Sequence, residues 1–415
     1  MESKEEIMQL LDSDYFCIMP WVHLHITCKG NMSACMSLME GSSSIGFGDL
    51  NCNSFEEIWQ GENIRKFRRR LLSGKKSYNC KKCYDREKVG FWSQRLDANR
   101  KYAEYIQWVI NTDEEGFAPD AKPIYWDIRI SNKCNLKCRM CSFDSSSAWY
   151  DDAIKMKFID PNKMNERVQG IRDRESFFNS IKKYIGDLKM VHIAGGEPFL
   201  HDENKLILRW LAEAQNHSVV IKYNTNLMIF DPEYIELWKP FHNVNLWVSI
   251  DGVGAQCEYI RKNMEFDTLL SHMEMLKKDS NVKLHCDITV SIFNIMTLTE
   301  FIHWAIESGY FPSDRVIINL LYMPQYLNIQ ILPQQMKQEI IGKLKEQLKW
   351  MENQQAKGFD HSVIIEQIQT CIAYIDAEDL SGLIPQFLQI TSGLDEIRKE
   401  NYLEVFPELK QLTAE

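Results

Sequence analysis

The sequence lacks three features that would each place the protein in a broad class. No uninterrupted apolar run among its 415 residues reaches the roughly 18 residues that a bilayer-spanning helix needs. Positive charge is not in excess, since 48 Lys and Arg stand against 58 Asp and Glu, for a formal net charge of −10. The opening MESKEEIMQLLDSDY lacks the basic, apolar, small-residue order of a signal peptide. These absences argue against a membrane partner, secretion and nucleic-acid binding, and we expect a cytoplasmic protein.

Cysteine, in contrast, is plentiful, with 12 in the chain. Clustered cysteines in a cytoplasmic protein more often bind metal or carry out redox chemistry than form disulfides. Cys134, Cys138 and Cys141 lie within eight residues of one another in the stretch ISNKCNLKCRMCSF. A structural zinc site needs four ligands, whereas three thiolates on a 4Fe–4S cube leave one iron open to a substrate or cofactor.

Composition and apolar pattern divide the chain into three predicted domains. Residues 1–115 hold six cysteines and a turn-rich stretch follows, which indicates a small α+β module and a linker. Residues 116–328 alternate short apolar runs with amphipathic segments, and residues 329–415 have a helical pattern. We expect this tail to cap or extend the middle domain.

The six apolar runs of the middle domain predict its fold. They are IYWDIRI, MVHIA, VVIKYN, VNLWVSI, VKLHCDITV and RVIINLL, each followed by a polar or glycine-containing stretch. Strands alternating with helices predict parallel βαβ units. We therefore expect an α/β protein with a partial (β/α)6 TIM-like barrel, whose active site forms at the carboxyl ends of the strands.

Alternation along the strands predicts a polar barrel interior. In IYWDIRI, Asp127 and Arg129 lie opposite the apolar residues, and in VKLHCDITV the same is true of Asp287. A closed barrel is normally filled by branched apolar side chains, so a polar interior favours an incomplete barrel that admits a ligand. The alternative is a buried salt-bridge network, for example Arg129 with Asp127 or Asp287.

Several motifs in this domain resemble those of one family. CNLKCRMC after the first strand resembles the signature of radical S-adenosylmethionine (SAM) enzymes, and AGGEP resembles their glycine-rich SAM motif. YNTNL, SIDG and Arg261 resemble elements of the branch that carries auxiliary clusters. The resemblance covers roughly residues 120–325. It implies that Cys134, Cys138 and Cys141 hold a 4Fe–4S cluster whose open iron binds SAM.

The resemblance also implies a set of SAM-binding residues. The Gly-Gly-Glu stretch would meet the SAM amino group, and Arg261 suits its carboxylate. Met140 departs from the aromatic residue that the family often places against adenine, although a thioether still packs on a purine. The alternatives are a tight turn for the glycines and an exposed helix position for Arg261. The full predicted set is Met140, Gly195, Gly196, Glu197, Asn224, Asn226, Ser249, Asp251, Arg261 and Ser291.

The N-terminal cysteines resemble a second module of the same branch. The spacing Cys-x12-Gly-x4-Cys, the later Cys-x2-Cys and the stretches PW and EIWQG are similar to the twitch module, a shortened SPASM domain. That module usually follows the barrel, and here it would precede it. The resemblance implies a second, auxiliary 4Fe–4S cluster, with Cys28 and Cys52 spare. Four cysteines with a Cys-x2-Cys knuckle also fit zinc. The expected ligands are Cys17, Cys35, Cys80 and Cys83.

The implied activity is reductive cleavage of SAM to a 5′-deoxyadenosyl radical that abstracts hydrogen from a substrate. We expect a peptide or protein substrate, with a small molecule or nucleotide as the alternative, and a reducing donor such as flavodoxin or ferredoxin. The non-enzyme alternative is an iron–sulfur redox sensor or a zinc-stabilised binding protein. Asp127 and Asp287 are candidate bases whose pKa burial would raise.

Three further features have two interpretations each. Cys257, just after SIDGVG, is a candidate hydrogen donor or a small buried residue at a helix start. The basic stretch RKFRRRLLSGKK contacts an acidic substrate or forms a solvated helix face. His23 and His25 alternate with apolar residues in WVHLHIT, and we expect them to be structural.

Overall fold

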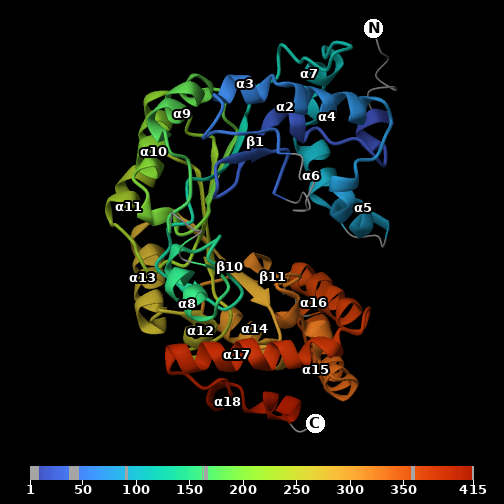
Figure 1. Cartoon of the computed structure of the whole chain (residues 1–415), viewed down its shortest axis with the longest axis vertical. Coiled ribbons are helices and arrows are strands. Elements are labelled where there is room, and N and C mark those ends of the chain that lie inside the picture. Colours follow the sequence, from blue (N-terminus) through green and yellow to red (C-terminus); the bar gives the residue numbers. More distant parts are fainter. Residues whose placement is uncertain are drawn as a thin grey trace. The chain divides into compact units, whose positions relative to one another are not determined.

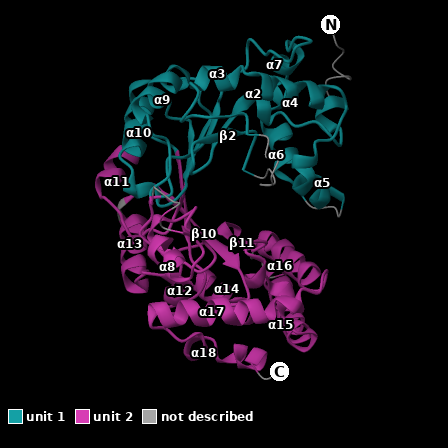
Figure 2. Cartoon of the chain, viewed as in Figure 1, with its two compact units in different colours: residues 1–132, 168–222, 240–242 teal, residues 133–167, 223–239, 243–415 magenta. Residues whose placement is uncertain are grey.

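The protein is described here by a computed structural model that covers residues 9–36, 46–88, 92–160, 162, 167–356 and 360–413 (Figure 1). The chain forms two compact units (Figure 2), each assembled from separated segments. The first comprises residues 1–132, 168–222 and 240–242, and the second comprises residues 133–167, 223–239 and 243–415. The predicted domain boundaries at 115/116 and 328/329 stay a prediction.

The first unit contains parallel strands to which the cysteine-rich region contributes one member. β1 (His23–Ile26) pairs in parallel with β4 (Tyr125–Arg129), and β4 pairs in parallel with β6 (Met190–Ala194). β2 (Asn31–Ser33) pairs antiparallel with β1, and β3 (Gly48–Asp49) pairs antiparallel with β2. All four residues of β1 are buried, as expected of a strand covered on both faces.

Short, locally capped helices surround these strands. Ser54 and Glu57 form a reciprocal capping box that begins α3, and α4 has Glu62 in its first turn and arginines in its last turn, which complements the helix dipole. α4 buries Ile64, Phe67 and Leu71. The helices of this unit are α2 (Met19–Val22), α3 (Phe55–Trp59), α4 (Glu62–Leu72), α5 (Lys81–Lys88), α6 (Gln94–Lys101), α7 (Ile106–Ile110), α9 (Arg174–Ile181) and α10 (Glu203–Glu213).

The second unit contains the later barrel strands. β10 (Lys283–Val290) pairs in parallel with β8 (Asn243–Ser249) and with β11 (Val316–Leu320). Burial alternates strictly along β8 and β10, so each strand has one apolar face and one polar, half-exposed face. β7 (Val220–Thr225) begins in the first unit and ends in the second. All six predicted strands are present, and the predicted partial (β/α)6 barrel is confirmed.

The helical tail predicted from the sequence lies in the second unit. α16 packs on β11 and on α15, and α18 packs on α12. None of the helices in the described part of the chain is long and apolar enough to cross a membrane. The helices are α8 (Tyr150–Lys155), α11 (Glu233–Trp238), α12 (Ala255–Ile260), α13 (Phe266–Asp279), α14 (Leu298–Glu307), α15 (Gln334–Gln355), α16 (Ser362–Ile375), α17 (Ile384–Arg398) and α18 (Tyr402–Val405).

Candidate active site and auxiliary module

The three-cysteine loop of the second unit is fixed by backbone hydrogen bonds. The short strands β5 (Lys137–Cys138) and β9 (Arg261–Lys262) pair antiparallel, with Cys138 opposite Arg261. The Cys141 amide donates to the Cys138 carbonyl at 3.0 Å, and the Trp149 indole donates to the same oxygen at 2.7 Å. A loop held in this way presents its three thiols on a rigid frame.

A buried ion pair lies directly against the middle thiol of this loop. Arg261 Nε lies 2.8 Å from Asp251 Oδ2, and Arg261 Nη1 lies 3.8 Å from Cys138 Sγ. The other Asp251 oxygen accepts a hydrogen bond from the Thr289 amide at 2.8 Å. Arg261 is 8% exposed and Asp251 is 1% exposed, so the alternative of an exposed helix position for Arg261 is wrong. Its contact with the SAM carboxylate stays a prediction.

The electrostatics of the loop favour a thiolate at Cys138. The hydrogen bond from Cys141 and the nearby Arg261 charge, acting against burial, lower the Cys138 pKa to about 7. The hydrogen bond to Cys138 and burial raise the pKa of Cys141 well above its usual value. Burial raises the pKa of Asp251, against the opposing charge of Arg261. Because an iron–sulfur cluster is bound by thiolates, a cation beside the middle thiol fits such a cluster.

The two predicted asparagines of the second unit contact different residues. Asn226 Nδ2 lies 3.9 Å from Cys134 Sγ and donates to Asn135 Oδ1 at 2.9 Å. Asn224 donates to Asp287 Oδ2 at 2.8 Å, and Asn319 donates to the other Asp287 oxygen at 2.6 Å. Asn226 is thus next to the cluster loop, whereas Asn224 positions the candidate base.

The remaining predicted SAM residues of the second unit are distributed around these groups. Ser249 pairs with Asp287 in the sheet register. Ser291 is buried in the turn after β10, where its amide donates to Asn294 Oδ1 at 2.8 Å. Met140 lines a pocket of about 390 Å³ together with Cys141 and Tyr326. Their roles toward SAM stay predictions.

The Gly-Gly-Glu stretch lies in the first unit, at the end of β6. Gly195 has a φ of +122°, and a Cβ there would lie 3.1 Å from the Ser131 carbonyl oxygen, so this position requires glycine. The Gly196 amide donates to that same carbonyl at 3.1 Å. Glu197 is 1% exposed, and its Oε1 accepts from the Phe199 amide at 3.2 Å. The tight-turn interpretation is confirmed, and the contact with the SAM amino group stays a prediction.

Asp127 corrects one expectation about the barrel interior. Its Oδ2 lies 3.0 Å from His25 Nδ1, and its Oδ1 lies 3.5 Å from His192 Nδ1 and 3.6 Å from Arg129 Nε. Burial alone would raise the Asp127 pKa, but His192, His25 and Arg129 hold it well below its usual range. The predicted rise is therefore wrong, and the salt-bridge alternative for Arg129 and Asp127 is confirmed.

Sequence reasoning missed His192 and treated His25 as structural. Both histidines reach Asp127 because β1, β4 and β6 are adjacent and in register, with His25 opposite Asp127 and Asp127 opposite His192. Alternation within HLHI and MVHIA could have placed each histidine on a polar face. The pairing of β1 with β4 has no local signal in the sequence.

Cys257 fits the structural alternative. Its side chain is fully buried, with Sγ 3.2 Å from Met264 Sδ, and burial raises its pKa to about 12. A thiol enclosed in this way packs as a small apolar group. Cys286 is also fully buried, as its position on the apolar strand face predicts.

The four predicted auxiliary ligands all belong to the first unit. Burial raises the Cys17 pKa well above its usual value, and the neighbouring thiols Cys80, Cys35 and Cys83 add to the rise. Burial likewise raises the Cys80 pKa, to about 11. The short helix η1 (Tyr78–Cys80) and α5 present two of these thiols three residues apart. Their role as ligands of one auxiliary cluster stays a prediction.

Among the residues that the structure describes, no three His, Cys, Asp or Glu side chains are grouped so as to hold a single metal ion. Cys52, one of the two spare cysteines, is exposed and lies with its Sγ 3.8 Å from Asp49 Oδ2.

Two family models match the chain. An iron–sulfur cluster-binding domain, SPASM, matches residues 17–84, and the radical SAM superfamily matches residues 128–305. The chain belongs to the radical SAM superfamily. Its SPASM module precedes the barrel, and the matched range includes all four expected auxiliary cysteines. No curated protein matches the sequence.

Two solved structures are among those similar to this chain. Streptococcus suis SuiB bound to S-adenosylmethionine has 12% identity and a TM-score of 0.36, with 80% of this chain and 69% of that chain covered. TYW1 with a lysine-pyruvate adduct bound has 13% identity and a TM-score of 0.27, with 54% and 71% covered.

Family membership defines the cofactors of this radical SAM enzyme. It uses SAM and a 4Fe–4S cluster, and its SPASM module implies additional iron–sulfur clusters. The match to an iron–sulfur domain favours a cluster over the zinc alternative for the four N-terminal thiols. Such an enzyme also needs a reductant and a substrate.

Proposed function

We propose that this enzyme abstracts a hydrogen atom from a peptide or protein substrate, with its auxiliary cluster taking part in electron transfer. The observation that carries the proposal is the three-thiol loop, in which Arg261 and Asp251 form a buried pair against Cys138. When bound, the cluster and SAM would supply a 5′-deoxyadenosyl radical. Cys134, Cys138 and Cys141 would hold that cluster.

The chain's own residues would keep this loop in one geometry. Arg139, between two of the cysteines, pairs with Glu400 at 2.8 Å and with Asp395 at 2.5 Å, both from the helical tail. Its guanidinium also lies 3.7 Å from the centre of the Tyr259 ring. Tail and loop therefore support one another, which restricts the positions available to a bound cofactor.

Asp287 is the better of the two candidate bases. It lies half-buried on the polar strand face, and its two oxygens accept hydrogen bonds from Asn224 and Asn319. These two amide donors hold the Asp287 carboxylate in one orientation on that face. Asp127 is fully enclosed by His25, His192 and Arg129, which favours a structural role.

Two parts of the proposal depend on the auxiliary module. They are its role in electron transfer and the choice of a peptide or protein as substrate. Four thiolates close a cluster and leave no iron free for a substrate, so its remaining function is to carry electrons or stabilise the fold. The resemblance to the branch with auxiliary clusters favours a peptide or protein over a small molecule.

The first test is the metal content and SAM cleavage of anaerobically purified protein. About eight irons per chain and 5′-deoxyadenosine formed on addition of reductant and SAM support two cubane clusters and radical chemistry. About four irons with one zinc would keep the enzyme but make the N-terminal module a zinc site. No iron and no SAM cleavage after reconstitution would overturn the proposal.

A further inference from the structure

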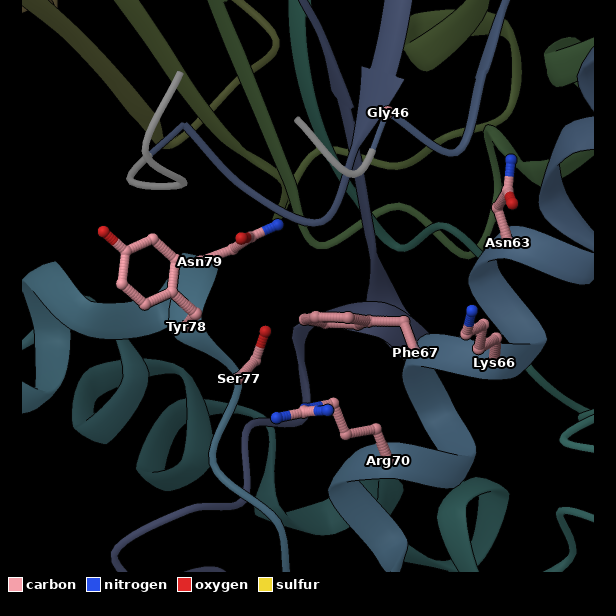
Figure 3. A pocket seen from close by; sticks show the side chains of 8 residues that line it. All are labelled: Gly46, Asn63, Lys66, Phe67, Arg70, Ser77, Tyr78 and Asn79. Atoms are coloured by element: carbon pink, nitrogen blue, oxygen red, sulfur yellow. The ribbon is translucent and has the colours of Figure 1, made fainter. Parts of the chain in front are cut away.

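A pocket of about 500 Å³ lies beside the auxiliary cysteines in the first unit (Figure 3). One wall is α4, which contributes Phe67 and Arg70, and the opposite wall is the segment that leads into Cys80. Neither the family match nor the SAM site assigns a role to this pocket. Its lining residues are Gly46, Asn63, Lys66, Phe67, Arg70, Ser77, Tyr78 and Asn79.

The pocket has positive charge that is not neutralised by the described residues. Arg70 donates from Nε and Nη2 to the Lys76 carbonyl at 3.0 and 2.7 Å, which fixes the guanidinium and leaves Nη1 for another acceptor. No described carboxylate pairs with Arg70 or Lys66, whereas the neighbouring Arg69 pairs with Glu62 at 2.6 Å. Within α4, an ion pair thus holds Arg69, whereas Lys66 and Arg70 line the pocket.

Asn79 provides an independent indication of a ligand. Its side chain is 8% exposed, and its Nδ2 has no hydrogen-bond partner in the described part of the protein. A buried amide donor without an acceptor costs about 1–3 kcal/mol, so such groups usually have a partner. An anionic oxygen in the pocket would satisfy this donor and pair with Arg70.

Aromatic groups complete the pocket. Phe67 is buried, whereas the Tyr78 ring is 71% exposed at the pocket rim. An inorganic anion would gain little from these two rings, but a carboxylate attached to an apolar or aromatic group would contact them. A planar guanidinium, an amide donor and aromatic surface together fit an acidic peptide segment.

We propose that this pocket binds an acidic, aromatic-containing segment of the substrate beside the auxiliary cluster. The inference rests on the proposed function and extends it, since it defines the chemistry of the peptide. Ser77, Tyr78 and Asn79 line the pocket, and Asn79 directly precedes Cys80 in the chain. A bound segment would therefore lie next to a ligand of the auxiliary cluster.

The test measures binding of two short peptides to the reconstituted full-length enzyme by titration calorimetry. The probes are N-acetyl-Glu-Phe-Glu-amide and its Gln-Phe-Gln counterpart, which has the same size and no charge. We expect saturable binding of the acidic peptide, at least tenfold weaker binding of the neutral one, and loss of affinity as salt increases. The substitutions Arg70→Gln, Lys66→Gln and Asn79→Leu should each weaken binding of the acidic peptide several-fold.

Lys75→Gln is the matched control, because Lys75 is an exposed cation just after α4 and outside the pocket. It should bind the acidic peptide as the wild type does. Iron content of every variant checks that the module still assembles. Equal weakening by Lys75→Gln and Arg70→Gln would mean nonspecific charge attraction and would overturn the proposal.

Two further outcomes separate this inference from the proposed function. Binding of inorganic phosphate that depends on Arg70, without binding of the acidic peptide, would assign the pocket to a free anion and overturn the peptide assignment. Enzyme that forms 5′-deoxyadenosine but binds neither probe overturns the pocket proposal alone. Enzyme that binds the acidic peptide but never cleaves SAM overturns the proposed function alone.

Discussion

Cys138 and Asp251 of the second unit have pKa shifts opposite in direction to those of the auxiliary thiols and Asp127 of the first. In the first unit, burial raises the pKa of the auxiliary thiols Cys17 and Cys80, while His192, His25 and Arg129 hold the pKa of Asp127 well below its usual range. In the second unit, the pKa of the thiol of Cys138 is lowered to about 7, and burial raises the pKa of Asp251.

The placement of basic side chains accounts for this difference. Arg261 lies between Cys138 and Asp251 and so contacts one thiol as well as one carboxylate. In the first unit the histidines and Arg129 surround Asp127 instead. Three cysteines bind an open cluster without a fourth protein ligand. A cation near one of these thiols favours its thiolate form.

The largest predicted effect comes from removing a thiol at either site. Cys138→Ala should abolish 5′-deoxyadenosine formation and lower the iron content by about four atoms per chain. Cys80→Ala should lose about four irons from the other module and leave the SAM-binding cluster assembled. Iron analysis and electron paramagnetic resonance of both variants measure this. If each variant lost all iron, the two sites would not assemble independently.

The second-largest predicted effect tests the buried ion pair of Arg261 and Asp251 in the second unit. Arg261→Met leaves the buried Asp251 without its partner and should lower the free energy of unfolding by about 3–5 kcal/mol. The double variant Arg261→Met/Asp251→Leu should recover most of that loss, since it removes the unpaired charge as well. Urea unfolding of the apo-proteins checks both values. Equal destabilisation in the single and double variants would contradict a buried ion pair.

A smaller effect concerns the pH dependence that Asp127 gives the first unit. Because its folded pKa lies below the unfolded value of about 3.9, it stabilises the fold above that pH, and this contribution is lost as the pH falls. Wild-type apo-protein should therefore lose more unfolding free energy between pH 5 and pH 3 than Asp127→Asn. Parallel urea titrations at the two pH values give the unfolding free energies of both proteins. An equal loss of unfolding free energy in the two proteins would exclude a depressed Asp127 pKa.

Local patterns were enough to predict much of the barrel. The apolar runs identified all six strands, and the alternation in VKLHCDITV placed Cys286 in the core. The cysteine spacing also gave the three-thiol loop after the first barrel strand. The strands and this loop depend on neighbours within about ten residues, which the sequence displays directly.

The errors arose where a property depends on distant residues. Burial of Asp127 was correctly inferred, but the sign of its pKa shift depends on His25, 102 residues before it, and on His192, 65 residues after it. Arg261 was allowed to be an exposed helix residue because its pairing with Cys138 joins segments 123 residues apart.

The sequence by itself determined which residue types are available: three thiols after the first strand of the barrel, four more before it, and polar groups on alternate strand positions. Tertiary structure decided which of these groups face one another. β1 lies beside β4 and supplies His25 to Asp127, and β9 lies beside β5 and supplies Arg261 to Cys138. The physical reason is that periodicity and spacing are encoded locally, whereas the charge around a buried group is set by strand pairing between distant segments.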